Sequence, residues 1–406
     1  MELPIVANPS YVDELSMEFA DIFVQKRQFE HFKRLMTAFP MAEKCTIAHM
    51  NSLFMEHTNQ SNLNRFITKS NWSIDDLNRK RFGMINETEG DGTVIIDDYI
   101  VEKYGEKIYG ADWHYDHSKG RSVWGVQVAD CVLSGKGIFP LRSTIYLKEQ
   151  SKWISDDTPF KTKIEIQKEN LTYLVEKGLK FSCVAMDVWY FCKKMTDHIE
   201  HLEKDWIAEA KSNRLIWFHG KWISLQNFAQ QMINKYNFRV VDIGDERYHM
   251  KAFSVRLKEM GTVRLLVSLN KYGNFKFYVS NRLDWKEVSL AKHYCPRWGI
   301  EVWHREGRGN YGIEDCLLRS RRRVEMYTTL SSLAANFLEI SSMCSPVYAS
   351  LIKQGRTPGM NHRWVAAELV GKLILSVGGT YNTDVRKIVE GLLCPYKSTM
   401  AKQEAS

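Results

Sequence analysis

The sequence lacks the patterns that mark several kinds of site and compartment. Its eight cysteines are scattered without a Cys-x-x-Cys pair, and its histidines form no cluster at zinc-ligand spacing, so we expect neither a structural zinc site nor a disulfide framework. It contains no 18-residue apolar run and no charged-then-apolar leader, which predicts neither a membrane span nor a secretion signal. Internal repeats and low-complexity tracts are also absent. A reduced, cytoplasmic protein with free thiols is the simplest interpretation.

The overall composition fits a globular protein of more than one domain. The chain has 406 residues, of which 44% are hydrophobic and 26% charged, so it can bury a substantial core over two or three domains. Its net charge of +8 suits a polyanionic partner, although many enzymes are equally basic. Twelve tryptophans and 18 tyrosines offer faces on which unstacked bases bind, but we expect most of them in the core.

Residues 1–90 are predicted to form helices with polar connections. Apolar residues recur at spacings of three and four over 12–35 and 41–57, and Ser73 is expected to cap a short helix that reaches Arg81. Lysine and arginine are frequent in this region. Composition leaves two interpretations open, a helical module that binds DNA ends and a solvated helical bundle.

The pattern then changes to strands alternating with helices. Strands are predicted at 92–98, 122–133, 138–147, 180–187 and 214–218, and helices at 160–179 and 190–211. This alternation predicts an α/β sheet with a parallel portion. Reactive groups in such sheets collect at the carboxyl ends of the strands, and two predicted strands end in acids, the first in Asp97 and Asp98 and the fourth in Asp187.

Residues 215–284 are rich in short alternating runs and turn residues. They predict an antiparallel insertion, with further sheet of the same domain as the alternative. Helices are expected afterwards at 313–343, 362–377 and 384–393. The basic run 319–323 is interpreted either as a solvated face or as a contact to phosphates.

Residues 294–308 (YCPRWGIEVWHREGR) place a glutamate among arginines at helical spacing. Plotted at 100° per residue, four side chains fall on one arc of about 80°: Arg297, Glu301, Arg305 and Arg308. Tyr294 joins them only if the helix continues through Pro296, which fits best at a first helical position. The arc is either a solvated face with i, i+4 ion pairs or a catalytic carboxylate surrounded by phosphate-binding arginines.

The order Tyr-x2-Arg-x3-Glu-x6-Lys characterises a large group of DDE transposases encoded by insertion sequences, and this segment resembles it closely. Tyr294, Arg297 and Glu301 match the signature, while Arg308 stands where the family has lysine, a change that keeps the charge but alters the donor geometry. The resemblance extends over roughly residues 91–323. It implies a ribonuclease H-like mixed sheet with flanking helices, interrupted by a β-rich insertion, between helical N- and C-terminal regions.

The resemblance also implies the site. The family's first aspartate often occurs as Asp-Asp-Thr, whereas this chain has Asp97-Asp98-Tyr99; the register favours Asp98, with Asp97 as the alternative. The second aspartate matches Asp187, and Trp189 replaces the small residue that commonly follows two places later. Asp98, Asp187 and Glu301 are thus the expected catalytic residues and ligands of Mg²⁺, with Mn²⁺ as a possible substitute. Four side chains are expected to contact DNA phosphates: Tyr294, Arg297, Arg305 and Arg308.

Three acids from two strands and a late helix suit two-metal phosphoryl transfer, in which two Mg²⁺ ions about 4 Å apart hold the attacking and leaving oxygens. The segment 110–120 approaches the second strand, and its Asp112, His114, Asp116 and His117 are interpreted as a polar loop near DNA or as a metal cluster.

The leading hypothesis is a cut-and-paste DNA transposase that binds the terminal inverted repeats of its element and inserts them into target DNA. By resemblance it would act as a homodimer on the nucleoid of a prokaryotic cell. A nuclease or resolvase of the same fold is a second hypothesis, and a catalytically silent DNA-binding protein is a third. The expected division of the chain is 1–90 for DNA-end binding, 91–214 and 285–345 for the catalytic domain, 215–284 for the insertion, and 346–406 for a helical C-terminal region.

Overall fold

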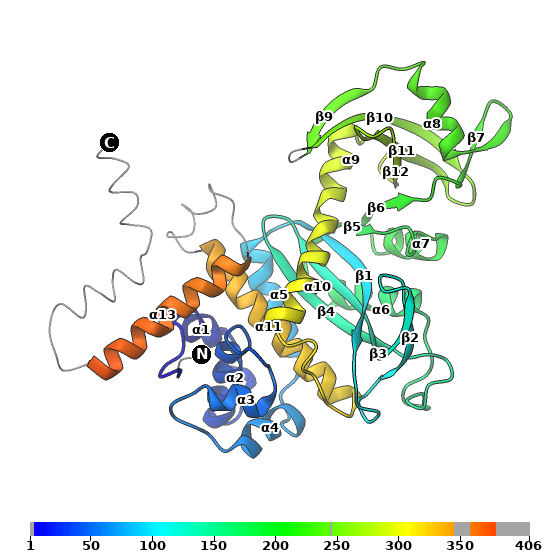
Figure 1. The fold of residues 1–406 in the computed structure, drawn as a ribbon. Coiled ribbons are helices and arrows are strands. Elements are labelled where there is room, and N and C mark those ends of the chain that lie inside the picture. Colours follow the sequence, from blue (N-terminus) through cyan, green and yellow to red (C-terminus); the bar gives the residue numbers. More distant parts are fainter. Residues whose placement is uncertain (1–3, 244–245, 345–357, 379–406) are drawn as a thin grey trace, which may run out of the picture. The chain divides into compact units, whose positions relative to one another are not determined.

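Helices occupy the first 88 residues, as the spacing of their apolar residues predicts. The structure, a computed structural model, describes residues 4–243, 246–344 and 358–378, and its contacts divide the chain into two units (Figure 1). The helical unit comprises residues 1–88, 101–111 and 304–406, and the sheet unit comprises residues 89–100 and 112–303. The predicted helix at 384–393 lies outside the described residues.

The helical unit contains helices from both ends of the sequence. They are α1 (Ser10–Ser16), η1 (Met17–Ile22), α2 (Lys26–Ala38), α3 (Ile47–Ser52), α4 (Gln60–Thr68), α5 (Ile74–Thr88), α11 (Arg321–Cys344) and α13 (Pro358–Gly378). Ser73 caps α5 by accepting a hydrogen bond from the Asp76 N–H at 3.1 Å, as predicted. The helix continues to Thr88 rather than ending near Arg81.

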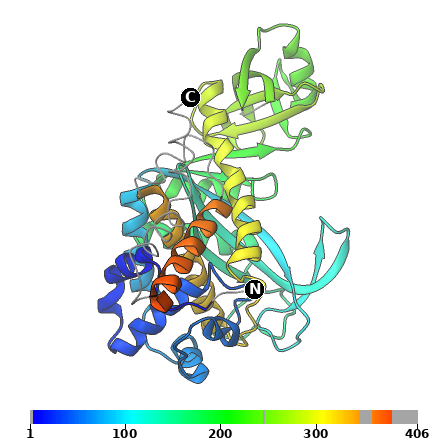
Figure 2. The ribbon, with the colours of Figure 1, turned by 60° about the vertical axis from the view of Figure 1, so that its left-hand side comes forward.

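Helix α11 packs among the N-terminal helices (Figure 2). The rings of Phe19 and Phe32 both contact Phe337 of α11, with centroid distances of 5.5 and 6.1 Å. This helix therefore shares a core with α1, α2, α4 and α5, although the sequence analysis assigned it to the catalytic region. It begins at Arg321, later than predicted. None of the described helices is long and apolar enough to cross a membrane.

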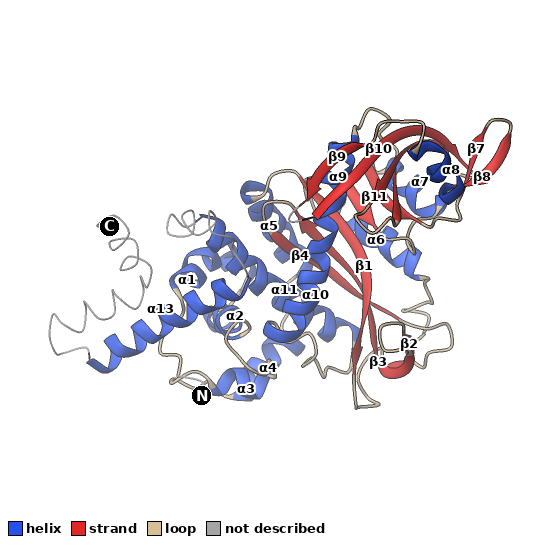
Figure 3. Cartoon of the chain, turned by 45° about the horizontal axis from the view of Figure 1, so that its top comes forward, coloured by secondary structure: helices blue, strands red, loops and turns tan. Residues whose placement is uncertain are grey.

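The sheet unit is built on a sheet of 12 strands (Figure 3). Its first half contains β1 (Gly92–Glu102), β2 (Asp112–Asp116), β3 (Arg121–Ser134), β4 (Ile138–Tyr146), β5 (Phe181–Met186) and β6 (Asp205–Ala210). The strand order is β2-β3-β1-β5-β6, with β4 paired to β3. β5 pairs in parallel with β1 and with β6, whereas β3 pairs antiparallel with β2 and β4. Helices α6 (Lys163–Glu176) and α7 (Lys193–His201) belong to this half. The predicted α/β class, a mixed sheet with flanking helices, is confirmed.

The β-rich insertion continues the same sheet. It comprises β7 (Leu215–Phe218), β8 (Lys221–Ser224), α8 (Leu225–Ile233), β9 (Arg239–Ile243), β10 (Glu246–Leu257), β11 (Gly261–Leu269) and β12 (Phe275–Ser280). Its strands pair antiparallel, and β12 pairs with β6. The region is therefore an antiparallel insertion and also further sheet of the same domain, so each of the two interpretations describes part of it. Helices α9 (Glu287–Tyr294), η2 (Cys295–Arg297) and α10 (Trp298–Asn310) follow.

Three expectations about the first half were wrong. The predicted helix over 190–211 is instead α7 followed by β6, because Glu203 adopts a positive φ of 58° and the next residues find a parallel partner in β5. The polar loop at 110–120 contains β2, an edge strand paired to β3. The first strand continues to Glu102, so Asp97 and Asp98 lie inside it, directly after its last residue paired with β5, Ile96.

Candidate active site

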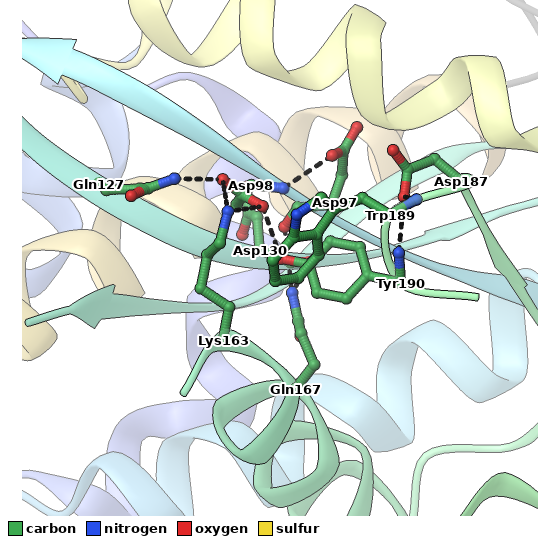
Figure 4. Close-up of polar contacts among 9 residues, drawn as sticks. All are labelled: Asp97, Asp98, Gln127, Asp130, Lys163, Gln167, Asp187, Trp189 and Tyr190. Atoms are coloured by element: carbon green, nitrogen blue, oxygen red, sulfur yellow. Dashed lines mark hydrogen bonds and ion pairs between the residues drawn. The ribbon is translucent and has the colours of Figure 1, made fainter. Parts of the chain in front are cut away.

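Asp97 and Asp98 are adjacent in β1, and neighbouring side chains of a strand point to opposite faces. The carboxylate of Asp98 is held by three partners (Figure 4): Lys163 Nζ lies 3.0 Å from both oxygens, the Tyr190 hydroxyl donates to Oδ1 at 2.7 Å, and Gln127 Nε2 donates to Oδ2 at 2.5 Å. A capping box of Thr162 and Glu165 begins α6 and so sets Lys163 at its first position.

Asp97 and Asp187 direct their carboxyl groups to one side of the sheet, away from Lys163 and Gln127 (Figure 4). Asp187 follows the end of β5, and its Oδ1 accepts the N–H groups of Trp189 at 3.0 Å and Tyr190 at 3.1 Å. Burial raises the pKa of Asp187, although these two N–H groups and Arg297 act in the opposite direction. Burial thus disfavours the charged carboxylate of Asp187, and a nearby cation stabilises it.

Arg297 supplies a positive charge at this site. Its Nη2 lies 2.6 Å from Glu301 Oε1, and its Nη1 lies 3.8 Å from Asp97 Oδ2. Burial opposes the charge of this guanidinium, but Tyr294, Glu301 and Asp97 outweigh that effect and raise the pKa of Arg297. One arginine thus links the first strand to the helix that carries Glu301.

The start of α10, which carries Glu301, is fixed closely against the sheet. A Cβ at Gly299 would lie 2.5 Å from Ser134 Oγ, so only glycine permits this approach. Ile300 is fully buried, and the Trp303 indole N–H donates to Asp130 Oδ2 at 2.8 Å. These contacts orient the side of α10 that bears Glu301.

The remaining members of the predicted arc lie elsewhere. The 3-10 turn η2 at Cys295–Arg297 joins α9 directly to α10, and Cys295 keeps right-handed helical geometry although it precedes a proline, so the expected start of a new helix at Pro296 was wrong. Tyr294 ends α9, and its hydroxyl donates to Glu209 at 3.1 Å. Of the expected i, i+4 pairs, Arg297–Glu301 is present. Arg305 lies 3.7 Å from Glu306, and Arg308 lies 3.8 Å from Glu314. Both are within the helical unit.

Among the described residues no group of three His, Cys, Asp or Glu side chains is close enough to hold an ion, either in segment 110–120 or at Asp97, Asp187 and Glu301. Asp112 and Asp116 accept hydrogen bonds from their own following residues, Trp113 and Ser118. His114 is buried between them. The two carboxylates thus accept hydrogen bonds from backbone N–H groups of their own segment.

Several residues of the site were missed in the sequence. Lys163 and Gln127 lie far from Asp98 along the chain and contact it only because α6 docks on the sheet and β3 lies beside β1. Asp130 contacts Trp303 of α10 across a still larger separation. Tyr190 alone carried a local signal, since it follows Asp187 by three residues.

Much of the sequence is similar to known proteins. Residues 32–225, which include both aspartate positions but not Glu301, match the family of DDE superfamily endonucleases. A probable transposase for insertion sequence element IS701 from Microchaete diplosiphon is 25% identical over 352 residues, covering 83% of this chain and 87% of the relative.

Two solved structures show weaker likeness. The piggyBac transposase synaptic complex with hairpin DNA has 12% identity and a TM-score of 0.41, covering 94% of this chain and 81% of that one. The Drosophila P element transposase strand transfer complex has 11% identity and a TM-score of 0.19, covering 90% and 65%. Likeness of this size establishes no function. The family match over residues 32–225 and the relative aligned over most of both chains make this chain similar to DDE endonucleases and to a transposase of an insertion sequence.

Proposed function

We propose that the protein binds the terminal inverted repeats of its insertion sequence, cuts them free and joins them to target DNA by two-metal phosphoryl transfer. The observation that carries this proposal is that Asp97 and Glu301 both pair with Arg297, whose charge also acts on Asp187. DNA is the partner, and a homodimer is the expected form in the DNA complex. The relative from Microchaete diplosiphon is a probable transposase, which supports the same reaction class.

We further propose Asp97 as the first catalytic carboxylate in place of Asp98. Asp97 pairs with Arg297 and accepts the backbone N–H of Asp98 at its Oδ1, whereas both oxygens of Asp98 are bound by the side chains of Lys163, Tyr190 and Gln127. A ligand must offer a lone pair to an incoming cation, and Asp98 would first have to leave three donors. Asp98 then serves as an anchor for Lys163 and Tyr190.

The donor set fits a divalent cation such as Mg²⁺. All three side chains offer carboxylate oxygens, which hard cations prefer, and the guanidinium of Arg297 already sits as a cation between two of them. Asp97, Asp187 and Glu301 would hold the metal, and Mn²⁺ would substitute for Mg²⁺. When bound, it supplies Lewis-acid stabilisation of the charge that develops on a phosphodiester under attack.

Several arginine and lysine side chains of the protein are suited to binding DNA. Arg297 keeps Asp97 and Glu301 together against their mutual repulsion until the substrate and metal arrive. Arg305 and Arg308 are solvent-accessible and suited to phosphate contacts, because guanidinium groups bind phosphate oxygens bidentately. In the N-terminal helices, exposed Lys26, Arg27, Arg65 and Lys69 support a role in binding the DNA ends.

The test uses the DNA segments that flank the coding region as substrate, with Mg²⁺. Asp97→Asn, Asp187→Asn and Glu301→Gln should abolish cleavage while leaving DNA binding largely intact, since each removes a charge with little change of shape. Asp98→Asn should retain measurable cleavage. Wild-type cleavage by Glu301→Gln would refute the metal site, and the reverse order for Asp97 and Asp98 would return the first role to Asp98.

A strand-joining assay separates this function from its main alternative. The cleaved ends should appear covalently joined to a target plasmid. Cleavage without joining would instead support a nuclease or resolvase of the same fold.

A further inference from the structure

Trp189 is a large exposed side chain directly beside a candidate catalytic carboxylate. It is 49% exposed, and its backbone N–H donates to Asp187 Oδ1 at 3.0 Å. A single exposed tryptophan is ordinary on a protein surface. What distinguishes Trp189 is that neighbouring side chains fix the orientation of its ring.

Two residues hold the indole in place (Figure 4). Lys163 Nζ lies 4.0 Å from the ring centroid, which is within cation–π range, and the Tyr190 ring packs edge-on with centroids 4.7 Å apart. Both neighbours are in turn bound by Asp98, Lys163 at 3.0 Å and Tyr190 at 2.7 Å. The indole therefore belongs to a preorganised network in which Asp98 is the common anchor.

We propose that Trp189, with Lys163 beside it, forms a nucleobase-stacking subsite for the nucleotide next to the scissile phosphate. The inference deepens the proposed function and rests on it. A phosphate that reaches Asp187 brings its adjoining nucleotide to the residues around that carboxylate, and Trp189 is bonded to it directly. A base displaced from the duplex needs a flat apolar surface to replace its lost stacking.

The arrangement favours a base over other occupants. An aromatic face accepts any of the four bases, while the ammonium of Lys163 adds attraction to the adjoining backbone phosphate. A core role would bury the ring, as happens to Trp206 and Trp303, which are each 2% exposed. Asp98 thereby acquires a function that does not require it to be a catalytic ligand.

The experiment combines protein variants with abasic DNA. Flanking-DNA substrates are made intact or with an abasic site at each of the two nucleotides that adjoin the scissile phosphate, and cleavage rates are measured with Mg²⁺. For the wild-type protein one abasic position should slow cleavage by about five- to 150-fold, the range expected for loss of one stacked base. Trp189→Ala should slow cleavage of intact DNA similarly and show no further loss on the abasic substrate.

Three controls separate stacking from folding. Trp189→Phe retains an aromatic face and should keep most of the activity and the abasic effect, whereas Trp189→Leu retains apolar bulk but should behave like Trp189→Ala. Trp217→Ala removes a tryptophan that is 44% exposed on β7, a strand separated from β5 by four others in the sheet. It should leave the abasic effect unchanged.

The outcomes distinguish this inference from the proposed function. Wild-type rates for Trp189→Ala, or losses that multiply when the variant and the abasic site are combined, would overturn the stacking subsite while leaving the transposase intact. Equal activity of the Leu and Phe variants would do the same. If the wild-type protein neither binds nor cuts the flanking DNA, the proposed function and the subsite both fail.

Discussion

The hydrogen bond from Trp303 to Asp130 is predicted to control cleavage by holding α10 in position. Asp130 is fully buried in β3 and also accepts the Ser143 hydroxyl at 2.8 Å. Trp303 lies two residues after Glu301, and its N–H donates to Asp130 at 2.8 Å. Trp303→Phe keeps an aromatic ring but removes this donor, so the start of α10 should shift on the sheet.

The magnitude follows from the burial. Leaving a buried acceptor without its partner costs about 1–3 kcal/mol, and the smaller ring of phenylalanine adds a cavity cost of about 1 kcal/mol. The free energy of unfolding should therefore fall by about 2–4 kcal/mol, which most proteins of this size survive. The cleavage rate should fall by more than the loss of stability alone suggests, because displacing a catalytic group by about 1 Å can lower a rate roughly 100-fold. DNA binding should change little.

Denaturant unfolding and single-turnover cleavage measure the two effects separately. Trp206→Phe is the matched control, since Trp206 is equally buried and its N–H donates to Glu200 at 2.8 Å in another part of the sheet unit. It should lose less stability, because the exposed Glu200 carboxylate can bind water instead, and it should retain cleavage. Adding Asp130→Asn to Trp303→Phe should cost less than the sum of the single changes. Additive losses, or equal loss of cleavage in both tryptophan variants, would refute the positioning role.

The other predictions concern the metal, the helix approach, pH and the arginines. EDTA should abolish cleavage, and Mg²⁺ or Mn²⁺ should restore it. Gly299→Ala should destabilise by about 1–3 kcal/mol through its clash with Ser134, which thermal unfolding would detect. Burial lowers the pKa of His114 to about 4, so the unfolded chain takes up the proton first and stability should fall by about 3 kcal/mol between pH 6.5 and pH 4; His114→Gln should flatten this profile in denaturant titrations. Arg308→Ala should reduce the slope of log affinity against log salt by about one, whereas Arg308→Lys should not; equal slopes would place Arg308 outside the DNA interface.

Local patterns predicted most elements of the sheet unit. The alternating apolar runs predicted β3, β4 and β5, whose pairing partners then enforce extended structure. Local patterns gave the wrong element where strand pairing in the tertiary structure overrides local preference. Residues 205–210 continue a helical pattern after α7, but they form β6 because β5 and β12 offer hydrogen bonds on both sides. The edge strand β2 was missed because its exposed aromatic and acidic residues resemble those of a loop.

The candidate site also has features that local sequence predicts and others that only tertiary contacts decide. The order of the acids along the chain and the signature around Glu301 predict the catalytic candidates and the reaction class, and both stay predictions. Nothing in the sequence reveals that Lys163 meets Asp98, because 65 residues separate them and only the docking of α6 brings them together. The choice between Asp97 and Asp98 stays a prediction, although their geometry now favours Asp97.

The sequence by itself determined what depends on near neighbours: the cap at Ser73, the Arg297–Glu301 pair and the family signature. These features rest on contacts within about four residues, which residue types and spacing specify directly. Only the tertiary structure decided which face of β1 each aspartate occupies and which cation it meets. Strand register sets that choice, and a shift of one residue would exchange the two carboxylates.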